Sequence, residues 1–92
     1  MDIVHDEKLK EFYTLTPSGK AFLRYHDDKG EVNFHYTYTP PSERGKGLAA
    51  KITKFAFEWA RKKRIRVISG CPYIRGRFLE EYPEYEKDMD LT

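Results

Sequence analysis

Hydrophobic and polar residues alternate along the first part of the chain. The run EVNFHYTYT, residues 31–39, places Val32, Phe34, Tyr36 and Tyr38 at every second position, which is the period of a half-buried β-strand. Two earlier runs, KEFYTLT and KAFLRYH, are also rich in strand-forming residues. The turn signals TPSG and DDKG separate the three runs. The pattern predicts an antiparallel meander of three strands, which ends at a Pro-Pro pair because proline cannot continue the ladder.

The hydrophobic period changes after Gly47. Spacings of three and four relate Leu48, Ile52, Phe55, Ala56 and Trp59, which predicts a helix with these residues on one face. The run RIRVISG then predicts a short strand. It should lie parallel to the third strand, because strand–helix–strand units cross over in that way.

The tail is expected to form a short helix over Ile74–Glu81, which Pro83 limits. The expected fold is therefore of the α/β (α+β) class, with a small mixed sheet and the order β-β-β-α-β-α. An antiparallel meander comes first and a parallel βαβ unit follows. At 92 residues, the chain has the length of one small domain, residues 1–92.

Composition and charge narrow the class of protein. The net charge of +2 is too small to indicate a nucleic-acid partner by itself. We expect no membrane contact and a cytoplasmic location, because no apolar run has the length of a membrane span and the single cysteine, Cys71, suits a reducing compartment. The three histidines are scattered, so the sequence predicts no metal site.

The loop before the helix is the most informative stretch. Arg44-Gly45-Lys46-Gly47 brings two glycines and two cations to a helix N-terminus, where backbone N–H groups can bind an anion such as a pyrophosphate. A simple turn with a glycine helix cap is the alternative. The Walker pattern is absent, and the dinucleotide fingerprint lacks its acidic partner because Ser69-Gly70-Cys71 follows the next strand.

A third phosphate motif fits this loop. Arg44, Gly47 and Ala49 satisfy the acetyl-CoA pattern [QR]-x-x-G-x-[GA]. Together with SGCPY and PEY further on, the stretch YTYTPPSERGKGLAAKI resembles the acetyl-CoA-dependent N-acetyltransferase superfamily (GNAT). Within it, the chain is similar to a compact, single-domain branch sometimes called the YjdJ-type N-acetyltransferase domain.

The resemblance implies a sheet whose central parallel strands splay apart around the pantetheine arm of CoA. It implies that the pyrophosphate sits on the amides of the glycine loop. Arg75 and Arg77 could meet the 3′-phosphate or adenine end of CoA, or form a solvated basic face. The implied acetyl-CoA-binding residues are Tyr38, Arg44, Gly45, Lys46, Gly47, Leu48, Ala49, Cys71, Pro72, Tyr73 and Arg75.

Three side chains are candidates for catalysis. Cys71 could accept the acetyl group transiently, line the ligand without reacting, or pack as an inert core residue. Tyr73 could protonate the thiolate or simply pack, and His35 could be a base or a surface residue. Strand alternation places His35 and Tyr36 on opposite faces.

We therefore expect a minimal N-acetyltransferase that transfers acetyl from acetyl-CoA to an unidentified amine, on a small molecule or a protein, as a monomer. A non-catalytic CoA- or acyl-CoA-binding or partner-binding module is the alternative. A nucleic-acid binder that uses the basic residues of 61–66 and exposed tyrosines is a third reading, against which the near-neutral charge counts.

Overall fold

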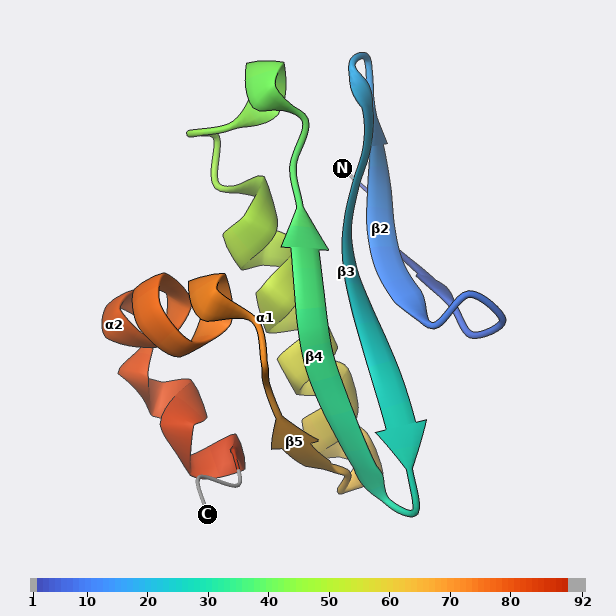
Figure 1. Ribbon diagram of the computed structural model, residues 1–92, viewed down its shortest axis with the longest axis vertical. Helices are drawn as coiled ribbons and strands as arrows, with labels where there is room; N and C mark the ends of the chain where they lie inside the picture. The colour runs from blue at the N-terminus through green and yellow to red at the C-terminus, as the bar shows by residue number, and fades with distance from the viewer. Residues whose placement is uncertain (1, 90–92) are drawn as a thin grey trace.

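The computed structural model describes residues 2–89, which form a five-stranded sheet in the order β1-β2-β3-β4-β5 (Figure 1). The strands are β1 Val4–Asp6, β2 Glu11–Thr16, β3 Gly19–Asp28, β4 Glu31–Tyr38 and β5 Arg66–Ile68. The first four pair in antiparallel fashion, and β5 pairs with β4 in parallel. The predicted fold class is confirmed, with β1 as an additional strand at the edge.

Helical segments follow β4 and β5. They are the 3₁₀ turn η1 Pro41–Glu43, helix α1 Leu48–Lys63, the π-helical segment η2 Ile74–Phe78, α2 Leu79–Glu81 and the 3₁₀ segment η3 Pro83–Asp88. Helix α1 covers one face of the sheet, and the segments after β5 lie beside it (Figure 1). Within residues 2–89, no helix covers the opposite face of β2–β4, which we call the open face.

The core lies between the sheet and α1. Phe12, Leu23 and Phe34 of the sheet meet Ile52 and Phe57 of the helix, and all five side chains are buried. Burial of such aromatic and aliphatic surface is the main source of stability for a domain of this size.

Of the five residues on the predicted helix face, Leu48, Ile52 and Ala56 are buried and Trp59 is partly buried against the core. The prediction is wrong at Phe55, which is 42% exposed. Phe57, which follows the buried Ala56 in the helix, fills the core instead of Phe55. Its ring packs edge-on against that of Phe34, with 5.2 Å between the ring centroids. The buried stripe therefore runs toward the helical segments after β5 as well as toward the sheet.

A β-bulge interrupts β4 at His35. Arg24 pairs with Tyr36 and Tyr25 pairs with Phe34, so His35 has no partner in β3. An extra residue in one strand reverses the facing of the residues beyond it.

The residues after the bulge show this reversal. The rings of Tyr36 and Tyr38 lie 5.8 and 5.6 Å from that of Phe22 on the open face. His35 stacks on His26 at 4.0 Å, on the same face. The expectation that His35 and Tyr36 face opposite ways was therefore wrong, since it assumed unbroken alternation.

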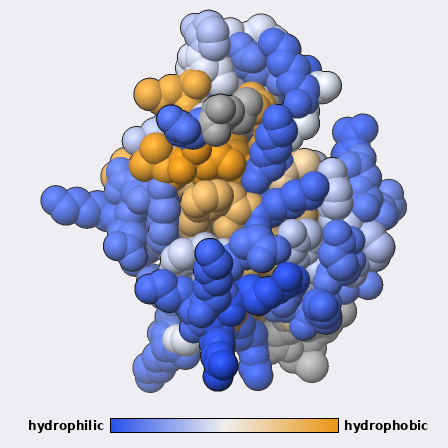
Figure 2. Space-filling view, turned by 180° about the vertical axis from the view of Figure 1, so that it is seen from behind, coloured by the Kyte–Doolittle hydropathy of each residue, from blue (hydrophilic) through white to orange (hydrophobic). Residues whose placement is uncertain are grey.

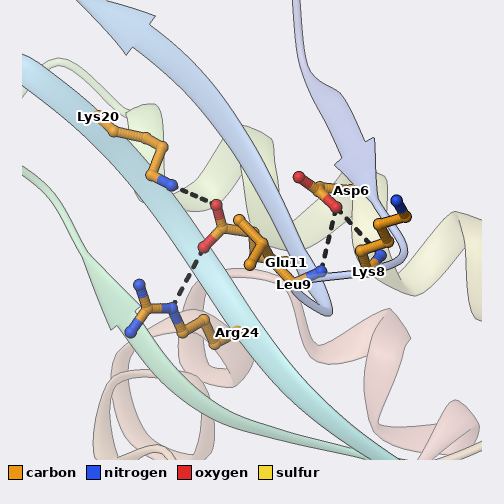
Figure 3. A network of polar contacts seen from close by, with 6 residues as sticks. All are labelled: Asp6, Lys8, Leu9, Glu11, Lys20 and Arg24. Atoms are coloured by element: carbon orange, nitrogen blue, oxygen red, sulfur yellow. Dashed lines mark hydrogen bonds and ion pairs between the residues drawn. The ribbon is translucent and has the colours of Figure 1, made fainter.

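Glu11 carries a buried carboxylate on the open face. Its side chain is 0% exposed and is bound by Lys20 and by Arg24, whose Nε lies 3.2 Å away (Figure 3). Both cations come from β3, the neighbour of β2, so the network ties these two strands together.

At the nearby hairpin, an Asp6 carboxylate oxygen accepts hydrogen bonds from the backbone N–H groups of Lys8 and Leu9 (Figure 3).

The outer edge of β5 meets the end of the described chain. Met89 makes an isolated parallel bridge to Val67, the middle residue of β5. The side chain of Met89 is buried, so this segment packs onto the sheet rather than passing over it.

Candidate active site

The glycine loop has the conformation that its sequence requires. Gly45 and Gly47 have φ angles of +83° and +79°, in the left-handed region that side chains rarely adopt. A Cβ added at either position would meet nothing within 4 Å, so the space above both glycines is open. The glycines are therefore needed for backbone conformation, and they leave room for a ligand to approach the backbone.

The N-terminus of α1 opens directly from this loop. Gly47 is the N-cap residue and offers no side-chain cap, and the first turn contains no acidic residue. The first N–H groups of a helix have no intrahelical partner and carry a partial positive charge. Arg44 adds a cation whose Nε donates a hydrogen bond to the carbonyl oxygen of Thr39, 3.0 Å away. The arrangement can bind an anion.

The parallel pair β4 and β5 separates before β4 ends. Pairing stops at Asn33 and Ile68, although β4 continues to Tyr38. Side chains then bridge the widening gap: the Ser69 hydroxyl donates to the Phe34 carbonyl at 2.7 Å, and Asn33 Oδ1 accepts from the Gly70 N–H at 3.1 Å. Within residues 2–89, the last residues of β4 therefore have no strand partner on this side.

One cleft joins the unpaired end of β4 to the glycine loop. It has a volume of about 690 Å³. Its walls are the end of β4, the first turn of α1 and the helix after β5. The predicted ligand-binding residues that line it are Tyr38, Arg44, Gly45, Gly47, Leu48, Ala49 and Tyr73.

The sequence pointed to Arg77 as well as Arg75, and of these two Arg77 lines the cleft. It did not point to Glu81, which faces the cleft from the helix after β5, or to Glu43, which faces it from η1. Tyr73, Arg77 and Glu81 are spaced by four residues, which places them on one helix face. That spacing was a signal in the sequence that could have identified Glu81 once Tyr73 and Arg77 were candidates.

Tyr73 keeps its proton in this environment. Burial, followed by the nearby charge of Glu81, raises the pKa of its phenol to about 12. A thiol has an ordinary pKa of about 8.5, so complete proton transfer from Tyr73 to a thiolate is uphill. The phenol is therefore suited to donate a hydrogen bond to a developing thiolate while it retains its proton.

Cys71 lies behind the cleft wall rather than in it. The residue is 4% exposed, and its backbone N–H donates to the Ser69 hydroxyl at 3.2 Å. Neither Cys71 nor the exposed Pro72 lines the cleft. The geometry therefore separates Cys71 from Tyr73, although only one residue stands between them in the sequence.

Three other predicted site residues lie outside the cleft. His35 is stacked on the open face, where burial and then the charges of His26 and Arg24 lower its pKa. A guanidinium N–H of Arg75 donates to the Ser69 carbonyl at 3.2 Å. Lys46 does not line the cleft, although its Nζ lies 3.0 Å from an oxygen of Glu43, which does.

The basic residues considered for nucleic-acid binding are also separated from the exposed tyrosines. Arg61 is engaged by Asp88 and Glu58 at the C-terminal end of α1. The aromatic rings of the open face instead lie near Lys20 and Arg24. The two features therefore do not form one interleaved surface.

The parallel strand pair β4–β5 splays apart, and a glycine loop and an uncapped helix N-terminus lie at its open end, an arrangement that can receive the anionic part of an extended ligand. Residues 11–89 match the model of the GCN5-related N-acetyl-transferase family. The chain belongs to that family, which confirms the predicted resemblance and places it among the N-acetyltransferases.

A solved structure supports the fold. The solution NMR structure of a GCN5-like putative N-acetyltransferase from Staphylococcus aureus is similar to this structure, with a TM-score of 0.69. The match covers 97% of this chain and 87% of that one, at 23% sequence identity.

Within residues 2–89, no helix is long and apolar enough to cross a membrane.

Proposed function

We propose that the protein transfers the acetyl group of acetyl-CoA to a primary amine, with the coenzyme in the 690 Å³ cleft. The observation that carries this proposal is the continuity of the cleft. It leads from the glycine loop to the unpaired end of β4, so one extended ligand can contact both. The pyrophosphate would bind the N–H groups at the start of α1, near Arg44.

The unpaired strand end would hold the pantetheine arm. The backbone at Tyr36–Tyr38 can hydrogen-bond the amides of the arm as a neighbouring strand would. The thioester would then lie near Tyr73, on the far side of the cleft from the loop. This placement brings the reacting carbonyl to the helix face that also carries Glu81.

The proposed reaction is direct transfer. The amine nitrogen bonds to the thioester carbonyl carbon, the C–S bond breaks with its electron pair on sulfur, and the amine proton ends on the thiolate. Glu81 would accept a hydrogen bond from the incoming ammonium and help to remove its proton. Tyr73 would stabilise the leaving sulfur by hydrogen bonding. No enzyme nucleophile is required, which agrees with the buried position of Cys71.

A titration of ¹⁵N-labelled protein with CoA tests the binding step. We expect the amide signals of Gly45–Gly47 and of Thr37 to shift together and to saturate. Shifts confined to the loop would indicate an anion site without a pantetheine groove. If no signal moved at millimolar CoA, the loop would be only a turn and a helix cap, and the proposal would be wrong.

A binding module without turnover is the second candidate. It is favoured by the high pKa of Tyr73, about 12, because a phenol that holds its proton this firmly is a poor acid toward a thiolate. Incubation with acetyl-CoA and a panel of amines separates the two, with free CoA as the measured product. Tight CoA binding with no thiol release above the uncatalysed rate would favour the module.

A further inference from the structure

A second hollow lies on the other side of the glycine loop. Its volume is about 540 Å³, large enough for a small organic molecule. It forms where the chain before β1 and the end of β2 flank the start of α1. The residues that line it include Asp2, Val4, Leu15, Glu43, Lys46 and Leu48.

The strand pairing explains why the hollow is open. The pair β1–β2 begins at Val4 and Tyr13, so β2 beyond Tyr13 has no partner on this edge within residues 2–89. Apolar side chains therefore remain uncovered: Leu15 is 75% exposed and Val4 is 43% exposed. Figure 2 shows apolar surface gathered near one end of the molecule, seen from behind, which is unusual on an otherwise charged surface.

The charges at this hollow are predominantly negative. Asp2 and Glu43 are its two carboxylates, and Lys46 is its one cation among the lining residues. Lys46 Nζ already contacts Glu43 Oε1 at 3.0 Å, so the charge of Lys46 is compensated. Within residues 2–89, Asp2 has no ion-pair partner, and a carboxylate beside apolar walls favours a ligand with a positive charge on an apolar body.

We propose that this hollow binds a small amine with an apolar body, through the carboxylate of Asp2 and the walls made by Val4, Leu15 and Leu48. The site is distinct from the acetyl-transfer cleft. It shares Glu43 and Leu48 with that cleft, but contains neither Thr37 nor Tyr73. The amine bound here is therefore not positioned for acetylation, and the inference stands whether or not the protein turns over.

Three matched probes test whether the charge of the ligand decides binding. Phenethylamine, 3-phenylpropionate and 2-phenylethanol share a phenyl ring on two methylene groups and differ in the end group and its charge. In titrations of ¹⁵N-labelled protein, we expect phenethylamine to shift the amides of Thr14–Thr16 and Lys46 with saturation. The anion and the alcohol should bind at least tenfold more weakly, a difference of about 1.4 kcal/mol.

Two variants locate the site, and a third serves as the control. Leu15→Lys places a cation in the hollow and should reduce phenethylamine affinity at least tenfold, and Asp2→Asn should reduce it several-fold. Leu9→Lys makes the same change at a leucine that is 61% exposed at the β1–β2 turn, outside the hollow, and should have no effect. Leu15 and Leu9 are both exposed, so neither change should unfold the protein.

Three results would overturn the proposal. Equal affinity for the amine and the carboxylate would show that charge does not select the ligand. Absence of saturable shifts at millimolar phenethylamine would show that the hollow does not bind amines of this kind. A dimer in light scattering that Leu15→Lys dissociates would show that a second copy of the chain covers this surface. CoA titrated in parallel reports on the other cleft, so failure of one site does not obscure the other.

Discussion

The sulfur of Cys71 lies 3.5 Å from Oγ1 of Thr37, across the gap that opens between β4 and the segment after β5. Thr37 lines the cleft and Cys71 does not, so the threonine stands between the thiol and any ligand. The thiol is therefore placed to support the wall of the site rather than to attack a thioester.

Replacement of Cys71 by alanine tests this placement. We expect acetyl-transfer activity within about threefold of the unmodified protein, and a loss of about 1 kcal/mol in unfolding free energy from the removed sulfur. Activity assays and urea unfolding measure the two effects. An activity loss of about 100-fold, together with an acetylated Cys71 in mass spectra, would instead identify it as a covalent acceptor.

Gly47→Ala should damage the protein through its backbone. A non-glycine residue in the left-handed region costs about 1–2 kcal/mol, and relief of that strain would rotate the first N–H groups of α1. We expect lower unfolding free energy and at least tenfold weaker CoA binding. Gly76→Ala is the matched control, because Gly76 has no positive φ and an added Cβ meets nothing within 4 Å. Equal effects of the two changes would argue against an anion site at the loop.

Tyr73→Phe removes one hydroxyl and keeps the ring. We expect the turnover rate to fall about 10- to 100-fold, the effect of a lost hydrogen bond to a charged group, with CoA affinity nearly unchanged. Because the pKa of Tyr73 is about 12, its ¹³C signal should not titrate until the pH approaches that value. An unchanged rate in Tyr73→Phe would remove the tyrosine from the mechanism.

Glu81→Gln tests the carboxylate that faces the cleft. We expect at least a tenfold decrease in kcat/KM for the amine, because the variant lacks the carboxylate that would take a proton from the incoming ammonium. The affinity for CoA should not change. Glu80→Gln changes the neighbouring carboxylate, which does not line the cleft, and should leave the rate unchanged. Equal losses in the two variants would point to a general charge effect rather than to a role for Glu81.

Stability should decrease in mild acid. Burial lowers the pKa of both His5 and His35 below the ordinary value of 6.5. The unfolded chain therefore binds more protons than the folded chain just below pH 6.5, so stability is complete above that pH and is lost as pH falls toward the lower folded-state values. Urea unfolding at neutral and mildly acidic pH measures this slope. His35→Asn should make the slope shallower, and an unchanged slope would contradict the expectation for His35.

The main elements were predictable because their patterns are local. Three patterns each act within a few residues. Polar and apolar residues alternate in β4 up to Phe34, turn residues stand before and after β3, and apolar residues recur every three or four positions from Leu48. The glycine loop was predictable for the same reason, since the positive φ angles at Gly45 and Gly47 are requirements of one loop.

The remaining features depend on contacts between distant segments. β1 has a single strongly apolar residue, Val4. It is held partly by His5, which stacks on Phe12 at 4.1 Å and contacts the Tyr25 hydroxyl at 2.6 Å. The bulge at His35 depends on registry with β3, and no short pattern in β4 reveals it. The burial of Cys71 depends on how far β4 and β5 have separated at that point.

The bridge between Met89 and Val67 has a consequence for the behaviour of the protein in concentrated solution. A strand at the edge of a sheet offers unpaired N–H and C=O groups that another chain can extend into a growing aggregate. In this molecule the end of the described chain returns to occupy that edge, so β5 offers a poorer template to a neighbouring copy. Truncation before Met89 should therefore shorten the time to aggregation, even where the acetyl-transfer cleft remains intact.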